Sequence, residues 1–227
     1  MPTETWTRLP EERRATVLAA AEAEFARNGY SRGSLNVIAR EAGVAKGSLF
    51  QYFDDKMDLF AHLSELAVER IGTAMAELVE TLDWDAGFFE AYAALADGWV
   101  QYFVEHPIDR SLSAAVFLEP DPEAHAAVRE IVDRNLIDFL RPLAESGRDA
   151  GWIRADADLD AFLTLQLLTL PHLALAPSHP ELDPLLGLGD DTLGVTQFED
   201  WVDTGEEYEL LDEVAKDRGE LDEAAAV

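Results

Sequence analysis

Hydrophobic positions recur along almost the whole chain with the three-to-four-residue spacing of an amphipathic α-helix. No segment alternates between apolar and polar residues as a half-buried strand does. The first helix is predicted over residues 10–29, because proline suits a first helical position and glycine suits the position after a helix end. Its apolar stripe consists of Val17, Leu18, Ala21 and Phe25. The pattern predicts an all-α fold.

Two short helices and one long helix are predicted next. Ser34 is expected to cap a helix that runs to about Ala42 and is ended by Gly43, and the following helix covers residues 45–52. Asp54 and Asp55 then precede a long helix whose start they can cap. The buried face of that helix is predicted to consist of Phe60, Leu63, Ala67, Ile71, Ala74, Leu78 and Leu82.

The rest of the chain repeats the helical pattern with a higher apolar content. We expect one helix that begins near Phe88 and is ended by His106-Pro107, and a short one near residues 110–118. A helix marked by Val128 to Leu143 and closed by Gly147 and Gly151 follows, and the last helix covers residues 159–170. The last of these is apolar nearly all round, and few later helices remain to cover it, so we expect it to form a dimer face. From Glu181 onward the chain holds 16 carboxylates and two basic residues, which predicts an exposed extension that is partly helical.

Charge is distributed unevenly along the chain. The 17 basic and 46 acidic residues give a net charge of −29. Residues 1–60 hold eight of the basic and nine of the acidic residues, whereas residues 61–227 hold nine basic and 37 acidic ones. Because the carboxylates are spread over every later segment, we interpret them as a solvated acidic surface rather than as a nucleic-acid mimic. The N-terminal quarter is spared this excess, which indicates a separate role for it.

The composition also excludes several kinds of site. There is no cysteine, so disulfide scaffolds, thiolate metal sites and thiol nucleophiles are excluded. The five histidines lie apart, without paired ligand spacing, and we expect neither a metal nor another cofactor. The start of the chain lacks the apolar core of a signal peptide, and no run of 18 uncharged apolar residues occurs. We therefore expect a cytoplasmic protein.

The segment SLNVIAREAGVAKGSLFQYF, residues 34–53, has the pattern of a helix-turn-helix. Its two short helices meet across a turn in which Gly43 can adopt a left-handed conformation. In such a motif the second helix lies in the major groove of DNA and is read from its N-terminal end. Small internal core positions are supplied by Val37, Ile38, Ala39, Val44 and Leu49.

Side chains on the second helix and after it have the chemistry that DNA contacts need. Lys46 and Ser48 can reach base edges or phosphates, and Gly47 allows a close approach of the backbone. Gln51 carries an amide that can pair with adenine. Tyr52 and Lys56 are suited to phosphate contacts, which position a protein on the duplex without reading its sequence.

At about residues 13–60 the chain resembles the TetR family of transcriptional regulators. The resemblance rests on AEAEFARNGY at the end of the first helix and on SLNVIAREAGVAKGSLFQYFDDKMDLF after it. It implies a three-helix DNA-binding domain, a helical ligand-binding domain and a homodimer built through C-terminal helices. Where the family usually has tyrosine this chain has Phe50, so a hydroxyl-to-phosphate bond is lost there. The family's DNA contacts, carried over by position, fall on Ser34, Asn36, Lys46, Gly47, Ser48, Phe50, Gln51, Tyr52 and Lys56.

These observations predict three parts: a DNA-binding domain over residues 1–56, a ligand-binding and dimerisation domain over residues 57–190, and an acidic extension over residues 191–227. We expect a regulator, acting as a repressor, that binds a palindromic double-stranded operator as a homodimer. A small hydrophobic molecule is expected to modulate it by favouring one spacing of the paired DNA-binding domains. Candidate residues for its pocket are Phe88, Tyr92, Trp99, Phe103, Phe117, Phe139 and His172.

Two other classes of protein stay open from the sequence. A helical enzyme or carrier with a buried apolar pocket would bind no duplex, and an acidic decoy would bind DNA-binding proteins instead of DNA. Residues 29–33 match the G-x-S-x-G pattern of serine hydrolases, but that motif requires a strand before it, and here an amphipathic helix precedes it. Asp156, Asp158 and Asp160 alternate without the glycine and distal glutamate of a calcium loop, so a helix cap explains them better.

Overall fold

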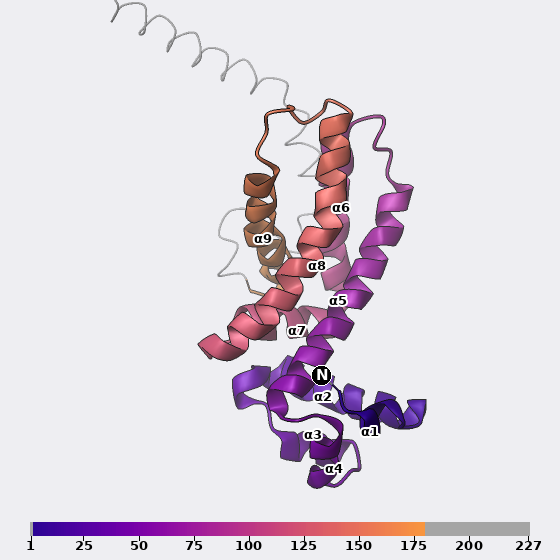
Figure 1. Ribbon diagram of the computed structural model, residues 1–227, viewed down its shortest axis with the longest axis vertical. Coiled ribbons are helices and arrows are strands. Elements are labelled where there is room, and N and C mark those ends of the chain that lie inside the picture. The colour runs from indigo at the N-terminus through magenta and orange to yellow at the C-terminus, as the bar shows by residue number, and fades with distance from the viewer. Residues whose placement is uncertain (1, 180–227) are drawn as a thin grey trace, which may run out of the picture. The chain divides into compact units, whose positions relative to one another are not determined.

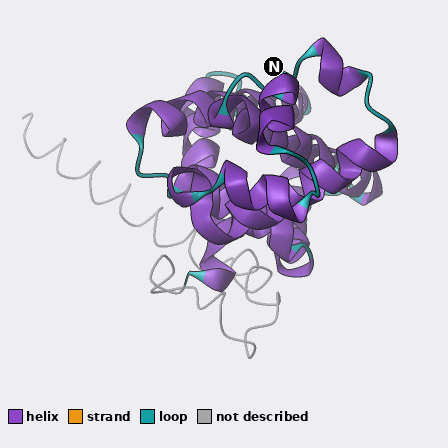
Figure 2. Ribbon diagram, turned by 90° about the horizontal axis from the view of Figure 1, so that it is seen from below, coloured by secondary structure: helices purple, strands orange, loops and turns teal. Residues whose placement is uncertain are grey.

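The computed structural model describes residues 2–179, and within this part of the chain every regular element is a helix (Figure 2). The all-α prediction is confirmed. The predicted extension over residues 191–227 lies outside the described residues. The helices are α1 (Glu4–Thr7), α2 (Glu11–Arg32), α3 (Leu35–Glu41), α4 (Lys46–Tyr52), α5 (Lys56–Thr81), α6 (Phe88–Glu105), α7 (Pro107–Phe117), α8 (Pro122–Asp149) and α9 (Leu159–Leu175), followed by a 3-10 turn (Ala176–Ser178).

The first four helices and the start of α5 share one hydrophobic core. In Figure 1, α3 and α4 lie below α2, and α5 runs upward from this group to the remaining helices. The largest fully buried side chains here are aromatic and aliphatic: Phe25, Ile38, Leu49, Phe53, Leu59, Phe60 and Leu63. Phe25 lies 5.1 Å from Phe60 between ring centroids, which joins α2 to α5. Burial of these side chains holds the two short helices, which are too short to be stable alone.

The upper half of α5 packs with α6, α8 and α9 in a second region of buried residues. Ile71 and Met75 of α5 meet Leu95 and Phe103 of α6, while Leu140 of α8 meets α9. The helix α7 lies between the two regions, and its Leu112 and Val116 belong to the core of the first. α5 and α7 therefore connect the N-terminal helices with the rest of the described chain.

Several helix boundaries differ from the sequence-based prediction, three of them at glycine or proline. At Gly29 the backbone adopts φ 68°, but one more turn follows this kink and α2 ends at Arg32. α8 continues through Gly147 to Asp149, and the ring of Phe88 packs where a Cβ atom of residue 147 would lie. α9 continues past Pro171 to Leu175. Glycine and proline disfavour a helix by their intrinsic propensity, but packing against neighbouring helices can outweigh this preference. Here the neighbouring helices favour continuation.

One face of α9 is apolar and exposed. Leu163, Leu170 and Ala174 are buried inside the chain, whereas Leu165 and Leu168 are 57% and 65% exposed. Over Leu159–Ser178 the chain is apolar and long enough to cross a membrane, although part of it packs in the core of the described residues. Within residues 2–179 the chain therefore covers only the inner face of this helix. A second copy of the chain could cover the outer face.

Tyr92 on α6 has a buried hydroxyl group with no hydrogen-bond partner among the described residues. Burial raises the pKa of this hydroxyl above its ordinary value. Because an unpaired buried hydroxyl costs free energy, we expect Tyr92→Phe to raise the free energy of unfolding by about 1 kcal/mol. Urea unfolding followed by circular dichroism measures this change.

Tyr102→Phe is the matched control for this prediction, since the hydroxyl of Tyr102 donates to Asp109 at 2.7 Å. Its removal leaves a buried carboxylate with one bond fewer, so we expect a loss of about 1–2 kcal/mol. Equal losses in the two variants would contradict the assignment of an unpaired hydroxyl to Tyr92.

Candidate functional site

The two short helices form a helix-turn-helix with Gly43 in the turn. Gly43 adopts φ 62°, a conformation that disfavours any residue with a Cβ atom. The amide of Val44 donates to the carbonyl of Ala39 at 2.9 Å, which closes the end of α3. Ile38, Ala39 and Leu49 are buried between the helices. The sequence-based prediction of this motif is confirmed.

The outer face of α4 presents the side chains that were predicted to meet DNA. Lys46, Gly47, Phe50 and Gln51 are exposed, and Ser48 is half-buried. Within residues 2–179 no carboxylate forms an ion pair with the ammonium of Lys46, although the chain is strongly acidic. A cation that stays without a partner in such a protein is available to an external anion.

Gly47 has no packing reason to lack a side chain. A Cβ atom built there would meet no described atom within 4 Å, and its backbone is helical. Helical glycine destabilises a helix by about 1 kcal/mol relative to alanine. This cost is consistent with a position where another molecule approaches the backbone closely.

The N-terminal segment supports the end of α4, which the sequence analysis did not predict. The amide of Thr3 donates to the carbonyl of Tyr52 at 2.9 Å, and the hydroxyl of Thr3 donates to the carbonyl of Gln51 at 2.6 Å. Trp6 of α1 is buried and lies 4.8 Å from Phe53 between ring centroids. A tryptophan within a polar N-terminal segment was the available signal. These contacts fix the helix that carries Lys46 and Gln51.

Two of the expected phosphate contacts have structural partners. Tyr52 is buried, with its ring 5.8 Å from that of Trp6. The ammonium of Lys56 donates to the carbonyl of Tyr30 at 2.8 Å and lies 4.3 Å from the centre of the Tyr30 ring. Both residues hold the motif together in this structure.

At the start of α3, Asn36 is exposed and Ser34 is half-buried. The expected side-chain cap by Ser34 is not formed. Instead the backbone amide of Ser34 donates to the buried carboxylate of Glu24 at 2.9 Å. Glu24 thereby fixes the first turn of the motif from α2.

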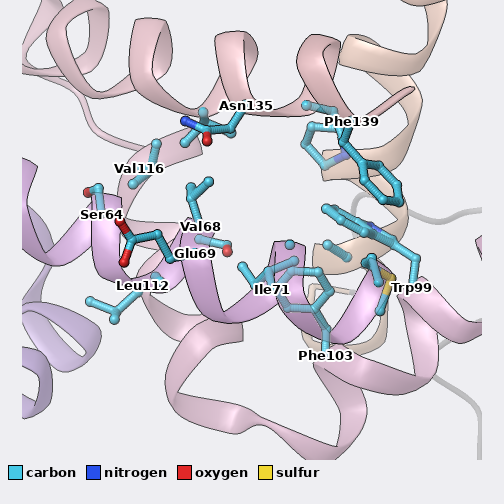
Figure 3. A pocket seen from close by; sticks show the side chains of 18 of the residues that line it. Ser64, Val68, Glu69, Ile71, Trp99, Phe103, Leu112, Val116, Asn135 and Phe139 are labelled. Carbon is cyan, nitrogen blue, oxygen red and sulfur yellow. The ribbon is translucent and has the colours of Figure 1, made fainter. Parts of the chain in front are cut away.

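A pocket of about 580 Å³ lies among α5, α6, α7, α8 and α9 (Figure 3). Its walls are mostly apolar, as in most sites for small molecules. Four of the seven predicted pocket residues line it, namely Trp99, Phe103, Phe117 and Phe139. The other three lie elsewhere: Phe88 packs against Gly147, Tyr92 borders a separate small void, and His172 is exposed on α9.

Most of the remaining pocket walls come from α7 and from α5, whose Ala67 and Ile71 were predicted to belong to a buried face. Ile71 and Met75 of α5, with Leu112 and Val116 of α7, are examples. Asn135 also lines the pocket, and it interrupts the apolar stripe of α8. A polar residue on an apolar stripe was a signal that could have indicated the pocket.

Comparisons with known proteins agree with this geometry. Residues 17–63 match the family described as bacterial regulatory proteins, tetR family. This chain thus resembles the TetR family of helix-turn-helix transcriptional regulators through its N-terminal helices. It is 24% identical over 177 residues to the transcriptional regulator YhgD of Bacillus subtilis, covering 76% of this chain and 88% of YhgD. To AcrR of Shigella flexneri it is 40% identical over 62 residues, 27% of this chain and 29% of AcrR.

The fold of the chain resembles solved structures over most of the described part. FadR from Bacillus subtilis, solved in complex with stearoyl-CoA, aligns with a TM-score of 0.61 at 21% identity and covers 74% of this chain and 89% of FadR. The proteins that this chain matches are transcriptional regulators and not enzymes. The G-x-S-x-G match at residues 29–33 lies in the last turn of α2 and the residue after it. It therefore follows a helix and not the strand that the serine hydrolase motif requires.

A buried carboxylate joins the N-terminal helices to α7 and α8. Glu119, in the turn after α7, is 8% exposed and accepts hydrogen bonds from the amide of Ser31 at 3.1 Å and from the Ser31 hydroxyl. It also accepts from the amide of Asp121 at 3.0 Å. Burial alone would raise the pKa of Glu119, but these bonds to the charged form outweigh it and lower the pKa below 4.5.

We expect Glu119→Gln to lower the free energy of unfolding at pH 7 by about 1.5–3 kcal/mol, the range for hydrogen bonds to a charged group. A carboxyl whose pKa is lowered by folding stabilises the fold above its unfolded pKa, and this contribution is lost as the pH falls through the folded value. The difference between the two proteins should therefore be full at pH 7 and shrink below about pH 4.5. Urea unfolding at pH 7 and at pH 4 measures it, and a difference that grows in acid would contradict the assignment.

Proposed function

We propose that this chain is a TetR-family regulator that binds a near-palindromic DNA operator as a homodimer, represses transcription there, and is released by a small amphipathic molecule. The observation that carries the proposal is the exposed face of α4. Lys46, Gly47 and Gln51 lie on this face. Among the described residues, no hydrogen bond or ion pair engages the side chain of Lys46 or Gln51, and no atom packs against Gly47 where a Cβ would lie. A buried core behind this face and the Thr3 contacts at its end keep it fixed.

The proposed DNA contacts fall into three kinds. Gln51 reads a base edge in the major groove, and Phe50 contributes an apolar contact such as one with a thymine methyl group. Lys46, Ser48, Ser34 and Asn36 contact phosphates or base edges. Tyr52 packs against Trp6, and Lys56 donates to the carbonyl of Tyr30. A phosphate contact by either residue would require the loss of these contacts, so we assign both mainly to the positioning of α3 and α4.

The proposed dimer uses the outer face of α9. Ala161, Thr164, Leu165 and Leu168 are exposed at the three-to-four-residue spacing of one helix face. A two-fold axis pairs such a face with itself, so one patch serves both subunits. It also presents two copies of α4 to two half-sites of a palindrome.

The pocket supports a small-molecule effector. Its volume and mostly apolar walls suit an amphipathic ligand, and FadR from Bacillus subtilis holds the amphipathic molecule stearoyl-CoA. The domain division at residues 56 and 57 remains part of the proposal, with α5 shared by both sides. A regulator of this kind acts on the chromosome, so we propose a cytoplasmic location.

The proposed coupling runs through α7. Leu112, Val116 and Phe117 of this helix line the pocket, and the turn that follows it holds the end of α2 through Glu119 and Ser31. A ligand that fits one position of α7 better than another will shift the population of DNA-binding arrangements by its difference in affinity.

Selection of bound sequences from a random duplex pool tests the proposal. The full chain is used at two salt concentrations, because phosphate contacts weaken as salt rises whereas base contacts persist. We expect enrichment of a palindrome whose half-sites are about one helical turn or more apart. Enrichment of no sequence at either salt concentration would overturn the proposal.

A further inference from the structure

The pocket offers almost no groups that could bind an anion. Of its lining residues, only Glu69 is ionisable, and none is a lysine, arginine or histidine. The carboxylate of Glu69 has no hydrogen-bond or ion-pair partner within residues 2–179. A carboxylate or phosphate placed in this pocket would lose its water shell without gaining a cationic partner.

Four polar side chains of the pocket already donate to backbone carbonyl oxygens. Each of these four groups forms one such bond, which uses the hydroxyl protons of Ser64 and Thr73, the ring N–H of Trp99 and one of the two amide protons of Asn135. The bonds run from Ser64 to Phe60 (2.9 Å), from Thr73 to Glu69 (2.8 Å), from Asn135 to Ile131 (2.8 Å) and from Trp99 to Leu170 (2.8 Å). These bonds leave the hydroxyl of Ser113 and one amide proton of Asn135 as the uncommitted side-chain donors among the described lining residues.

The two ends of the pocket have different chemistry. Figure 3 shows Glu69 near Ser64 and Leu112 at one end, and Trp99, Phe103 and Phe139 together at the other. Trp99 and Phe103 meet edge to face with ring centroids 5.1 Å apart. The faces of aromatic rings attract cations and repel anions. A positively charged ligand can be favoured at both ends, and an apolar tail can fill the space between.

The part of the chain that forms the pocket is negatively charged, as is Glu69. Residues 61–179 hold seven basic and 21 acidic residues, a net charge of −14. A potential of this sign concentrates cations near the pocket and repels anions. Of the basic residues nearby, Arg70 is paired with Asp109 and Glu22, and Arg129 with Asp133.

We infer that the effector of this pocket is a cationic amphipathic molecule, such as an amine or quaternary ammonium with an apolar tail, and not a fatty acid or its coenzyme A thioester. This inference rests on the proposed function, in which the pocket binds an effector. Glu69 pairs with the cationic head, and the apolar walls bind the tail.

Isothermal titration calorimetry with four ligands that share a decyl chain tests the inference on the full protein. The ligands are decyltrimethylammonium, decanol, decanoate and decanoyl coenzyme A, each below its micelle concentration. We expect the ammonium to bind about fivefold to tenfold more tightly than the alcohol, from an exposed ion pair together with aromatic contact. The two anions should bind more weakly than the alcohol.

Glu69→Gln is the test variant, and Glu80→Gln is its matched control. Glu80 is exposed on the same helix and does not line the pocket. Glu69→Gln should bring the affinity for the ammonium to within about twofold of that for the alcohol, while Glu80→Gln should leave the difference between the ligands unchanged. Thermal unfolding of both variants checks that they fold.

The failures of this inference and of the proposed function are distinguishable. If decanoate or decanoyl coenzyme A binds most tightly and changes operator affinity, the effector pocket stands and the inferred charge is wrong. Equal affinities for the ammonium and the alcohol would also overturn the inferred charge. If none of the four ligands binds and none changes operator affinity, both the inference and the proposal of this pocket as an effector site are overturned.

Discussion

Replacing Lys46 and Gln51 together by alanine should lower the affinity for the selected operator by at least about 30-fold. A glutamine paired with a base contributes about 1–3 kcal/mol, and the proposed dimer makes this contact in each half-site. Removal of Lys46 adds the loss of one phosphate contact per subunit, which lowers affinity for every sequence alike. Both side chains are exposed, so the fold should be unaffected. Fluorescence anisotropy with operator and scrambled duplexes measures the change.

The matched control is Gln101→Ala with Arg148→Ala. It likewise removes one amide and one cationic side chain, here from α6 and α8. We expect operator affinity to change by less than about twofold, as for surface substitutions outside a site. A comparable loss in the control and in the test variant would mean that α4 does not read the DNA.

Replacing Leu165 and Leu168 together by glutamate should convert the proposed dimer into a monomer. At 57% and 65% exposure these leucines can accept charge without cost to the core of their own chain, but two pairs of carboxylates facing each other across a two-fold axis would repel. Operator affinity should fall by about 100-fold or more, because the two half-sites no longer act together. Analytical ultracentrifugation and anisotropy measure the two effects.

Val104→Glu, on an exposed apolar position of α6, controls for added charge at a surface. It should leave both the sedimentation coefficient and operator affinity as they are in the natural sequence. Should the double variant on α9 still sediment as a dimer, the proposed subunit interface would be wrong.

The sequence predicted the DNA-reading motif well because its local requirements are strict. Gly43 has to adopt a left-handed turn, and Ile38, Ala39 and Leu49 have to fill a small core between two helices. Such requirements involve neighbours in sequence, so a single sequence records them. Residues 1–60 were also distinguished by charge, because they lack the large excess of acidic residues that the rest of the chain carries.

The pocket was only half predicted, because its walls depend on contacts between distant helices. Trp99 and Phe139 were identified by their aromatic character, but Phe88 belongs to the same stripe and fills the space beside Gly147 instead. No periodicity distinguishes an apolar side chain that lines a cavity from one that fills it. The hydrogen bonds from Ser31 to Glu119 were not predicted for a similar reason, since 88 residues separate the two in the sequence.

The central claim is that the exposed face of α4 enters the major groove. The chain has no cysteine, so Gln51→Cys introduces a single thiol to which a DNA-cleaving iron chelate can be attached. On the selected operator we predict two clusters of strand cuts, related by the operator's two-fold axis and centred in the major groove of each half-site. Cuts spread evenly along the duplex, or cuts no stronger than those from Gln101→Cys on α6, would contradict the account.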